Sequence, residues 1–184
     1  MAVRLNKNSI PDEIYFLTFT INDWQNIFVN DEYCSFVYKW FDYVRQKYDN
    51  KIHSYAIMPN HIHVLMTISP KSPNLTILIM NAKRFMAKSI VNKLQEEKRI
   101  KLLEKFTLKA RKREGANYKI FTDRFDSLVI QSEKFWLQKL NYIHNNPSQE
   151  KWSLVVNPED YKYSSAANYI LNNGFYKYLD LITA

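Results

Sequence analysis

Two strand-like segments on either side of a tight turn constrain this chain more than any other feature. The segments "KIHSYAIM" (51–58) and "HIHVLMTIS" (61–69) are rich in apolar and β-branched residues. They flank Pro59 and Asn60, which are both common in turns. We therefore expect the two segments to pair as antiparallel strands, and this hairpin is the centre of the predicted fold.

The other periodic segments alternate between strands and helices. An apolar stripe with helical spacing follows Asn30 or Asp31, either of which can cap a helix. A second helix is expected to start near Asn74, with Phe85 among the residues of its inner face. Further expected elements are a strand at 13–21, a strand within 118–130, a helix from Ser132 to Pro147, and a short helix opening at a serine of 161–169.

This order of elements predicts an α+β fold, in which helices pack on an antiparallel sheet of about four strands. At 184 residues, the chain is most simply a single domain spanning 1–184. Its only cysteine, Cys34, excludes disulfides within the chain and thiolate metal cages. Its two glycines, Gly115 and Gly174, exclude the glycine-rich phosphate loops of Walker and Rossmann proteins.

The charge balance points to a polyanionic partner. The formal net charge is +8, although a solvated basic surface without a partner is the alternative. Residues 98–113 hold eight basic residues and one acidic residue, so this block is a candidate for phosphate contact or else a solvated helix extension. The candidate DNA-binding residues are Lys83, Arg84, Lys88, Arg124, Arg111, Lys112 and Arg113.

Neither a signal peptide nor a membrane span is expected. The N-terminal residues reach Pro11, Asp12 and Glu13 before any apolar run, and no apolar run approaches the length of a membrane span. We therefore expect a cytoplasmic protein without a membrane partner.

The segment "HIH" places His61 and His63 two residues apart in a predicted strand. Residues i and i+2 of a strand point to the same face, so the two imidazoles could share one cation. Ile62 and the residues that continue its face would then point into the core. The alternative is that both histidines are partly exposed on a solvated face.

The helix ending at Pro147 adds two polar side chains. At about 100° per residue, Tyr142 and Asn146 lie within roughly 40° of each other on one helix face. His144 lies about 200° from Tyr142 and is expected to point elsewhere. A phenol and an amide oxygen could therefore meet a metal at the histidine pair, whereas the alternative for Tyr142 is an ordinary surface or core tyrosine.

Three motifs occur in a fixed order: "MPNHIHVLM", then "YIHNNP" about eighty residues later, then "PEDYKYSSA". In this order they resemble the single-tyrosine HUH transposases, in particular the REP-associated tyrosine transposases and their IS200-like relatives. The resemblance covers most of residues 14–170. The chain departs from it after "NNP", where no glycine follows, and in the basic stretch of about 98–118, which looks like an insertion.

The resemblance implies an RRM/ferredoxin-like sheet and a single-stranded DNA substrate carrying a hairpin. It further implies that His61, His63 and Asn146 bind a divalent ion and that Tyr142 is the nucleophile. With an oxygen-rich substrate, Mg²⁺ or Mn²⁺ is the expected ion. Asp126 is either a residue that orients a ligand histidine or a turn carboxylate.

These inferences predict a metal-dependent endonuclease and strand transferase that works through a 5′-phosphotyrosine. A non-cutting hairpin-binding protein derived from a transposase is one alternative. A metal hydrolase that uses activated water is another. For the oligomeric state, the sequence is compatible with a monomer or a homodimer.

Overall fold

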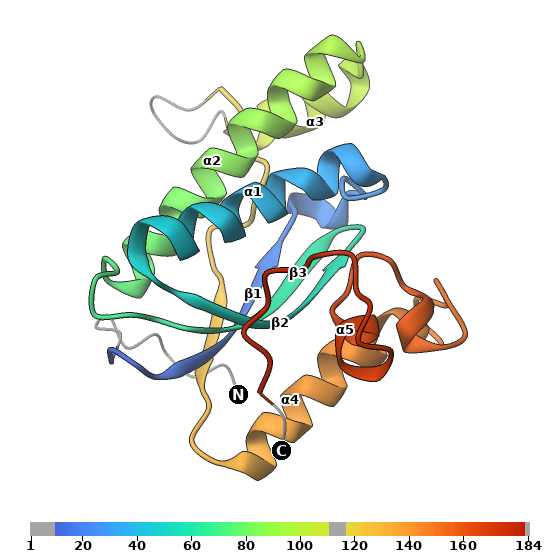
Figure 1. The fold of residues 1–184 in the computed structure, drawn as a ribbon. Coiled ribbons are helices and arrows are strands. Elements are labelled where there is room, and N and C mark those ends of the chain that lie inside the picture. The colour runs from blue at the N-terminus through green and yellow to red at the C-terminus, as the bar shows by residue number, and fades with distance from the viewer. Residues whose placement is uncertain (1–9, 111–116, 183–184) are drawn as a thin grey trace.

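The computed structural model describes residues 10–110 and 117–182, and its centre is a four-stranded antiparallel sheet (Figure 1). The strand order is β2-β3-β1-β4, which confirms the predicted α+β architecture. The hairpin is not central, however, because β2 is an edge strand and only β3 lies inside the sheet. The strands are β1 (Ile14–Thr20), β2 (Lys51–Met58), β3 (His61–Thr67) and β4 (Asp126–Val129).

Helices cover both faces of the sheet (Figure 1). One face carries α1 (Asp31–Tyr48) and α2 (Leu75–Glu96), and α3 (Ile100–Ala110) packs against α2. The other face carries α4 (Glu133–Asn145) and α5 (Ala166–Ile170). Three 3₁₀ turns complete the described elements: η1 (Asn22–Trp24), η2 (Asn146–Ser148) and η3 (Pro158–Asp160). None of the helices in the described part of the chain is long and apolar enough to cross a bilayer.

Side-chain caps fix the starts of three helices as the sequence predicted. Asn30 accepts a hydrogen bond from the Tyr33 N–H at 3.1 Å, and Asn74 accepts one from the Ile77 N–H at 3.0 Å. Ser132 accepts one from Phe135 at 3.3 Å. Each bond satisfies a donor that the first helical turn leaves without a partner.

The alternation along β3 separates two cores. Ile62, Val64 and Met66 pack with α1 and α2, whereas Leu65 packs with the inner face of α4. His61 and His63 therefore lie on the face that α4 partly covers, as the strand period predicts. The prediction for Phe85 was wrong, because this residue is 44% exposed, in a groove between α1 and α2.

A bulge in β2 brings a third histidine to the α4 face. The pairing with β3 shifts between Ile52 and Ser54, so His53 is an extra residue in the edge strand.

His144 points away from Tyr142, as expected, and its Nε2 lies 3.1 Å from Ser54 Oγ and 2.9 Å from Ser165 Oγ. His144 therefore belongs to a buried hydrogen-bond cluster that ties α4 to β2.

The segment that follows η3 covers the free edge of β2. The Ile57 N–H donates to the Tyr163 carbonyl at 2.8 Å, and the Ser165 N–H donates to the Tyr55 carbonyl at 2.9 Å. The Tyr55 N–H in turn donates to Ser165 Oγ at 3.0 Å. These bonds satisfy edge groups that would otherwise offer a template for another strand.

Replacement of Ser165 tests how much this cover contributes to stability. Ser165→Ala leaves the Tyr55 N–H without its acceptor and His144 without one hydroxyl partner. We expect the free energy of unfolding to fall by about 1–3 kcal/mol, measured by urea denaturation. Ser35→Ala removes an exposed hydroxyl that bonds only within its own helix and should change stability by less than about 0.5 kcal/mol. Equal effects of the two substitutions would contradict the role of Ser165.

Candidate active site

A cavity of about 600 Å³ opens on the α4 face of the sheet. Strands β1, β3 and β4 form its floor, α4 forms one wall, and the segments around Trp24 and Trp152 form part of its rim. His61, His63 and Tyr142 all line this cavity. The two histidines from the strand and the tyrosine from the helix therefore meet in one place.

Neighbouring side chains hold both imidazoles by their Nδ1 atoms. The sheet register places Thr18 opposite His63, and Thr18 Oγ1 lies 2.9 Å from His63 Nδ1. Asn60 Oδ1 lies 2.7 Å from His61 Nδ1, and the Asn60 amide NH₂ donates to Asn26 Oδ1 at 3.2 Å. Because an amide oxygen can only accept, His61 Nδ1 carries the proton and its Nε2 keeps a lone pair.

Burial keeps both histidines neutral. Each side chain is only 4% exposed. Burial lowers the pKa of His61 to about 4, and the positive charge of Lys151 adds to this effect. Burial also lowers the pKa of His63 well below its usual value, with smaller contributions from His61, Lys151 and Lys139. Neutral imidazoles are the form that binds metal ions, so no proton has to be displaced at neutral pH.

Tyr142 and Asn146 lie at the end of α4, one turn apart. The Tyr142 ring is 37% exposed, and its centroid lies 5.2 Å from that of His63. Asn146 is completely buried, and neither its amide oxygen nor its amide nitrogen has a hydrogen-bond partner. His63 Nε2 is likewise buried without a partner. Buried polar atoms without partners destabilise a fold, and a ligand bound to these atoms would remove that cost.

Among the described residues, no three His, Cys, Asp or Glu side chains are grouped so that they could hold a metal ion. The candidate donors are instead two imidazole nitrogens and one amide oxygen. These donor types fit a divalent ion that keeps open positions for water and for an oxygen-bearing substrate.

The sequence reasoning missed two lysines and two tryptophans of this cavity. Lys139 precedes Tyr142 by one helical turn, and its ammonium lies 5.6 Å from the centre of the Tyr142 ring. The i, i+3 spacing on a predicted helix could have revealed Lys139. Trp24 comes from a three-residue 3₁₀ turn, and Lys151 and Trp152 come from an irregular segment, so none of them carries a periodic signal.

The orienting role considered for Asp126 is not seen. The register aligns Asp126 of β4 with Thr18 of β1, and Thr18 with His63 of β3. Asp126 is therefore two strands from His63, about 10 Å away, with Thr18 between them. Thr18 and Asn60 hold the two rings instead. Asp126 does line the same cavity as an exposed carboxylate.

The basic residues that were predicted to bind DNA do not lie on one surface. Lys83, Arg84 and Lys88 all belong to α2, on the far face of the sheet from the histidine pair. Arg124 is exposed in the segment before β4. Arg111, Lys112 and Arg113 lie outside the described residues.

Lys83 has a structural environment that the sequence did not reveal. Its Nζ donates to the carbonyls of Thr122, Asp123 and Arg124 at 2.8, 3.3 and 2.9 Å. Burial lowers the pKa of its ammonium to about 8, so the group is still mostly charged at neutral pH. These bonds fasten the segment before β4 to α2, and they leave Lys83 poorly placed to contact DNA.

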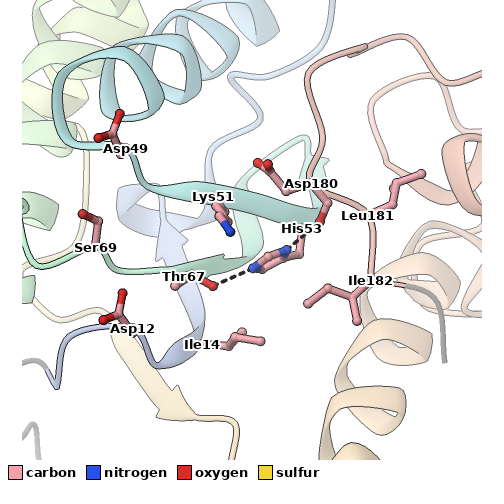
Figure 2. Close-up of a pocket in the computed structure, with 10 residues that line it drawn as sticks. All are labelled: Asp12, Ile14, Asp49, Lys51, His53, Thr67, Ser69, Asp180, Leu181 and Ile182. Atoms are coloured by element: carbon pink, nitrogen blue, oxygen red, sulfur yellow. Dashed lines mark hydrogen bonds between the residues drawn. The ribbon is translucent and has the colours of Figure 1, made fainter.

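A second cavity, of about 630 Å³, lies at the other end of the same face, beside His53 (Figure 2). Both nitrogens of this histidine are occupied, because Nδ1 lies 2.6 Å from the Asp180 carbonyl and Nε2 lies 2.7 Å from Thr67 Oγ1. His53 therefore has no free nitrogen for a ligand and tethers the C-terminal segment to the sheet.

An antiparallel sheet that presents two neutral histidines beside a helix-borne tyrosine is the arrangement expected of a tyrosine transposase. Comparison with known families agrees, because the family described as "Transposase IS200 like" matches residues 12–146. The chain belongs to this family of enzymes, which confirms the resemblance drawn from the three motifs.

Two solved structures are similar to this chain. One is a REP-associated tyrosine transposase bound to a REP hairpin, with a TM-score of 0.63 and 15% identity over 98% of this chain and 99% of that one. The other is a putative transposase from Deinococcus radiodurans R1, with a TM-score of 0.46 and 15% identity over 78% and 97% of the two chains. At this identity the first structure supports the fold alone. The search of curated proteins found no match.

Lys83→Met separates a structural role for this lysine from a role in DNA binding. The substitution leaves three carbonyls without their shared donor, so we expect the free energy of unfolding to fall by about 1–3 kcal/mol. DNA affinity, measured by fluorescence anisotropy with the folded variant, should stay close to that of the wild type. Arg84→Gln on the exposed side of α2 should leave stability within about 0.5 kcal/mol. Unchanged stability combined with a large loss of DNA affinity in Lys83→Met would reverse the assignment.

Proposed function

We propose that this transposase cuts and rejoins single-stranded DNA through a covalent bond between Tyr142 and a 5′ phosphate. One observation carries the proposal most directly. The Tyr142 ring lies 5.2 Å from the ring of His63, whose Nε2 is buried and has no hydrogen-bond partner. The proposed nucleophile, Tyr142, therefore lies beside an imidazole nitrogen that is free to bind a metal ion, in a cavity open to solvent.

The residues that would hold a divalent ion are His61 and His63, through Nε2, and Asn146, through its amide oxygen. Two observations support this choice. The polar atoms of His63 Nε2 and of the Asn146 amide have no hydrogen-bond partner, and both imidazoles are neutral. When bound, Mg²⁺ or Mn²⁺ would offset the charge of a phosphate oxygen and help to align the phosphodiester. Neutral protein ligands would leave the full charge of the ion available for this purpose.

The protein's own groups supply the rest of the reaction. Tyr142 Oη forms a bond to phosphorus while the bond from phosphorus to O3′ breaks. The phenol proton passes to water, and the released O3′ takes up a proton from water. The Lys139 ammonium, beside the Tyr142 ring, attracts the phosphate to the nucleophile. The phosphotyrosine keeps the energy of the broken bond, so a second 3′-OH can attack it and rejoin strands without ATP.

The proposed partner is single-stranded DNA that carries a hairpin. The net charge of +8 supports a polyanionic partner, and the similar REP-associated transposase was solved with a REP hairpin. Arg124 and the basic block 98–113 are the proposed backbone contacts. Within that block, α3 buries Leu103 and Phe106 and exposes Lys101 and Lys105, so its charged side remains available.

Tyr142→Phe tests the nucleophile. Phenylalanine keeps the ring contacts with His63 and Phe16 but lacks the attacking oxygen. We expect normal folding and DNA binding, but no covalent protein–DNA adduct on a denaturing gel with hairpin DNA and Mn²⁺. Tyr43→Phe changes an exposed tyrosine of α1 on the other face of the sheet and should form the adduct normally.

The same experiment separates the proposed function from its alternatives. A hydrolase using activated water would still cut DNA in the Tyr142→Phe variant. A non-cutting binding protein would give no adduct even with the wild-type chain. An adduct formed by Tyr142→Phe would mean that another tyrosine is the nucleophile.

A combined His61→Ala and His63→Ala variant tests the metal site. We expect its Mn²⁺-dependent cleavage to fall by about 100-fold or more, because a bound cation contributes several kcal/mol to such a reaction. Calorimetric titration with Mn²⁺ should show no binding at this site. His53→Gln removes another buried histidine of the same sheet, and it should lower stability while preserving both cleavage and Mn²⁺ binding. Undiminished cleavage in the double variant would rule out these ligands.

A further inference from the structure

Two tryptophans lie at the end of the active-site cavity away from Tyr142. Trp24 comes from η1, directly after β1, and Trp152 comes from the irregular segment after η2. Their ring centroids lie 5.7 and 5.3 Å from that of His61. The two indoles are 6.5 Å apart and are tilted by 33° to each other. Two segments far apart in sequence therefore bring aromatic rings together beside one proposed metal ligand.

The setting of these rings favours a ligand with a flat face. Trp24 is 58% exposed, although so large a side chain is usually mostly buried. Its backbone and that of Asp23 both have a φ of 53°, a left-handed conformation that is unfavourable for residues with side chains. The fold thus holds an exposed indole at the rim of the cavity in a costly conformation. Aromatic rims of this kind bind single-stranded nucleic acid by stacking on its bases.

The rings of the site are arranged in sequence across the cavity. The Tyr142 ring contacts His63 at 5.2 Å, His63 contacts His61 at 4.7 Å, and His61 contacts both tryptophans. In the described part of the chain, no ring contact joins Tyr142 directly to Trp24 or Trp152. The histidine pair therefore separates the proposed nucleophile from the tryptophan pair.

This order gives the DNA strand a direction. In phosphoryl transfer, the attacking and leaving oxygens lie roughly in line on opposite sides of phosphorus. Attack by Tyr142 Oη from one end of the histidine pair directs the leaving O3′ towards the other end. The nucleotide that carries O3′ is the one on the 5′ side of the cut. Its base would thereby reach Trp24 and Trp152, while the nucleotide that becomes linked to Tyr142 would lie on the Lys139 side.

We propose that Trp24 and Trp152 form a stacking site for the base on the 5′ side of the cleaved bond. The inference rests on the proposed function and adds a substrate subsite to it. Stacking keeps the strand with the free 3′-OH next to the phosphotyrosine after cleavage. The same group is then in position to attack in the reverse direction, so the tryptophan pair supports rejoining as well as cutting.

The test first locates the cut and then removes one base at a time. Wild-type adducts formed with Mn²⁺ on a library of hairpin strands with randomised flanks are sequenced to find the cleaved bond. Two further substrates carry an abasic site directly 5′ or directly 3′ of that bond. Adduct formation on the intact and abasic substrates is then measured for the wild type, Trp24→Ala, Trp152→Ala and the double variant. Phe85→Ala serves as the control, because it removes an exposed ring on the far face of the sheet.

We expect Trp24→Ala and Trp152→Ala each to slow adduct formation about tenfold, and Trp24→Phe and Trp152→Phe to retain most of the rate. The 5′ abasic substrate should slow the wild type by a similar factor and slow the double variant no further, because both changes remove the same contact. The 3′ abasic site should act independently of the tryptophans. Calorimetry with Mn²⁺ should show that the variants still bind the ion.

Independent effects of the 5′ abasic site and the double variant would overturn the subsite, as would a shared effect with the 3′ abasic site. Either result would leave the proposed function intact if the wild type forms the adduct. Absence of any wild-type adduct would instead refute the proposed function. The stacking role would then be judged by anisotropy with a labelled oligo(dT) strand, where unchanged affinity in the double tryptophan variant would refute it too.

Discussion

The pairing of β3 with β1 is the interaction on which the rest of the site depends. Side chains of a strand alternate between its faces, so a slip of one residue would exchange the two sets. Ile62, Val64 and Met66 prevent this slip, because all three are completely buried against the helices of the opposite face. The same register aligns Thr18 with His63, whose Nδ1 it contacts at 2.9 Å. The hydrophobic core and the polar site are thus fixed by one alignment.

The second core places the tyrosine. Trp136, Leu140 and Ile143 bury one side of α4 against the sheet, and the His144 hydrogen bonds with Ser54 and Ser165 anchor its last turn. With these contacts made, Tyr142 is directed to the cavity and Asn146 to the interior. Burial by the same elements keeps the pKa of both histidines low, so the packing that positions the site also sets its protonation state.

Features that depend on interactions between residues close in sequence could be predicted. Asn30 and Ser132 cap their helices as expected, and the second helix begins at Asn74 as expected. The period of two along 61–66 predicted which face carries the histidines. The sequence did not predict features that need the tertiary structure. Lys83 was predicted to be a surface cation, because the residues next to it in sequence do not reveal that the segment Thr122–Arg124 contacts its side chain. The two alternatives for Asp126 could not be separated, because sequence distance does not show that Thr18 lies between Asp126 and His63. The tryptophan pair joins a three-residue 3₁₀ turn to an irregular segment, so no periodicity could indicate it.

The cover of the β2 edge has a consequence for the order in which the parts of the site come together. β2 is complete by Met58, but its outer partners are Tyr163 and Ser165, which are synthesised more than a hundred residues later. Contacts between residues so distant form late, because the chain between them must first be ordered. While the chain is still being synthesised, the histidine hairpin exists without its tyrosine helix or its edge cover. The complete site therefore forms only after the segments on both sides of α4 have been synthesised and have packed against the sheet.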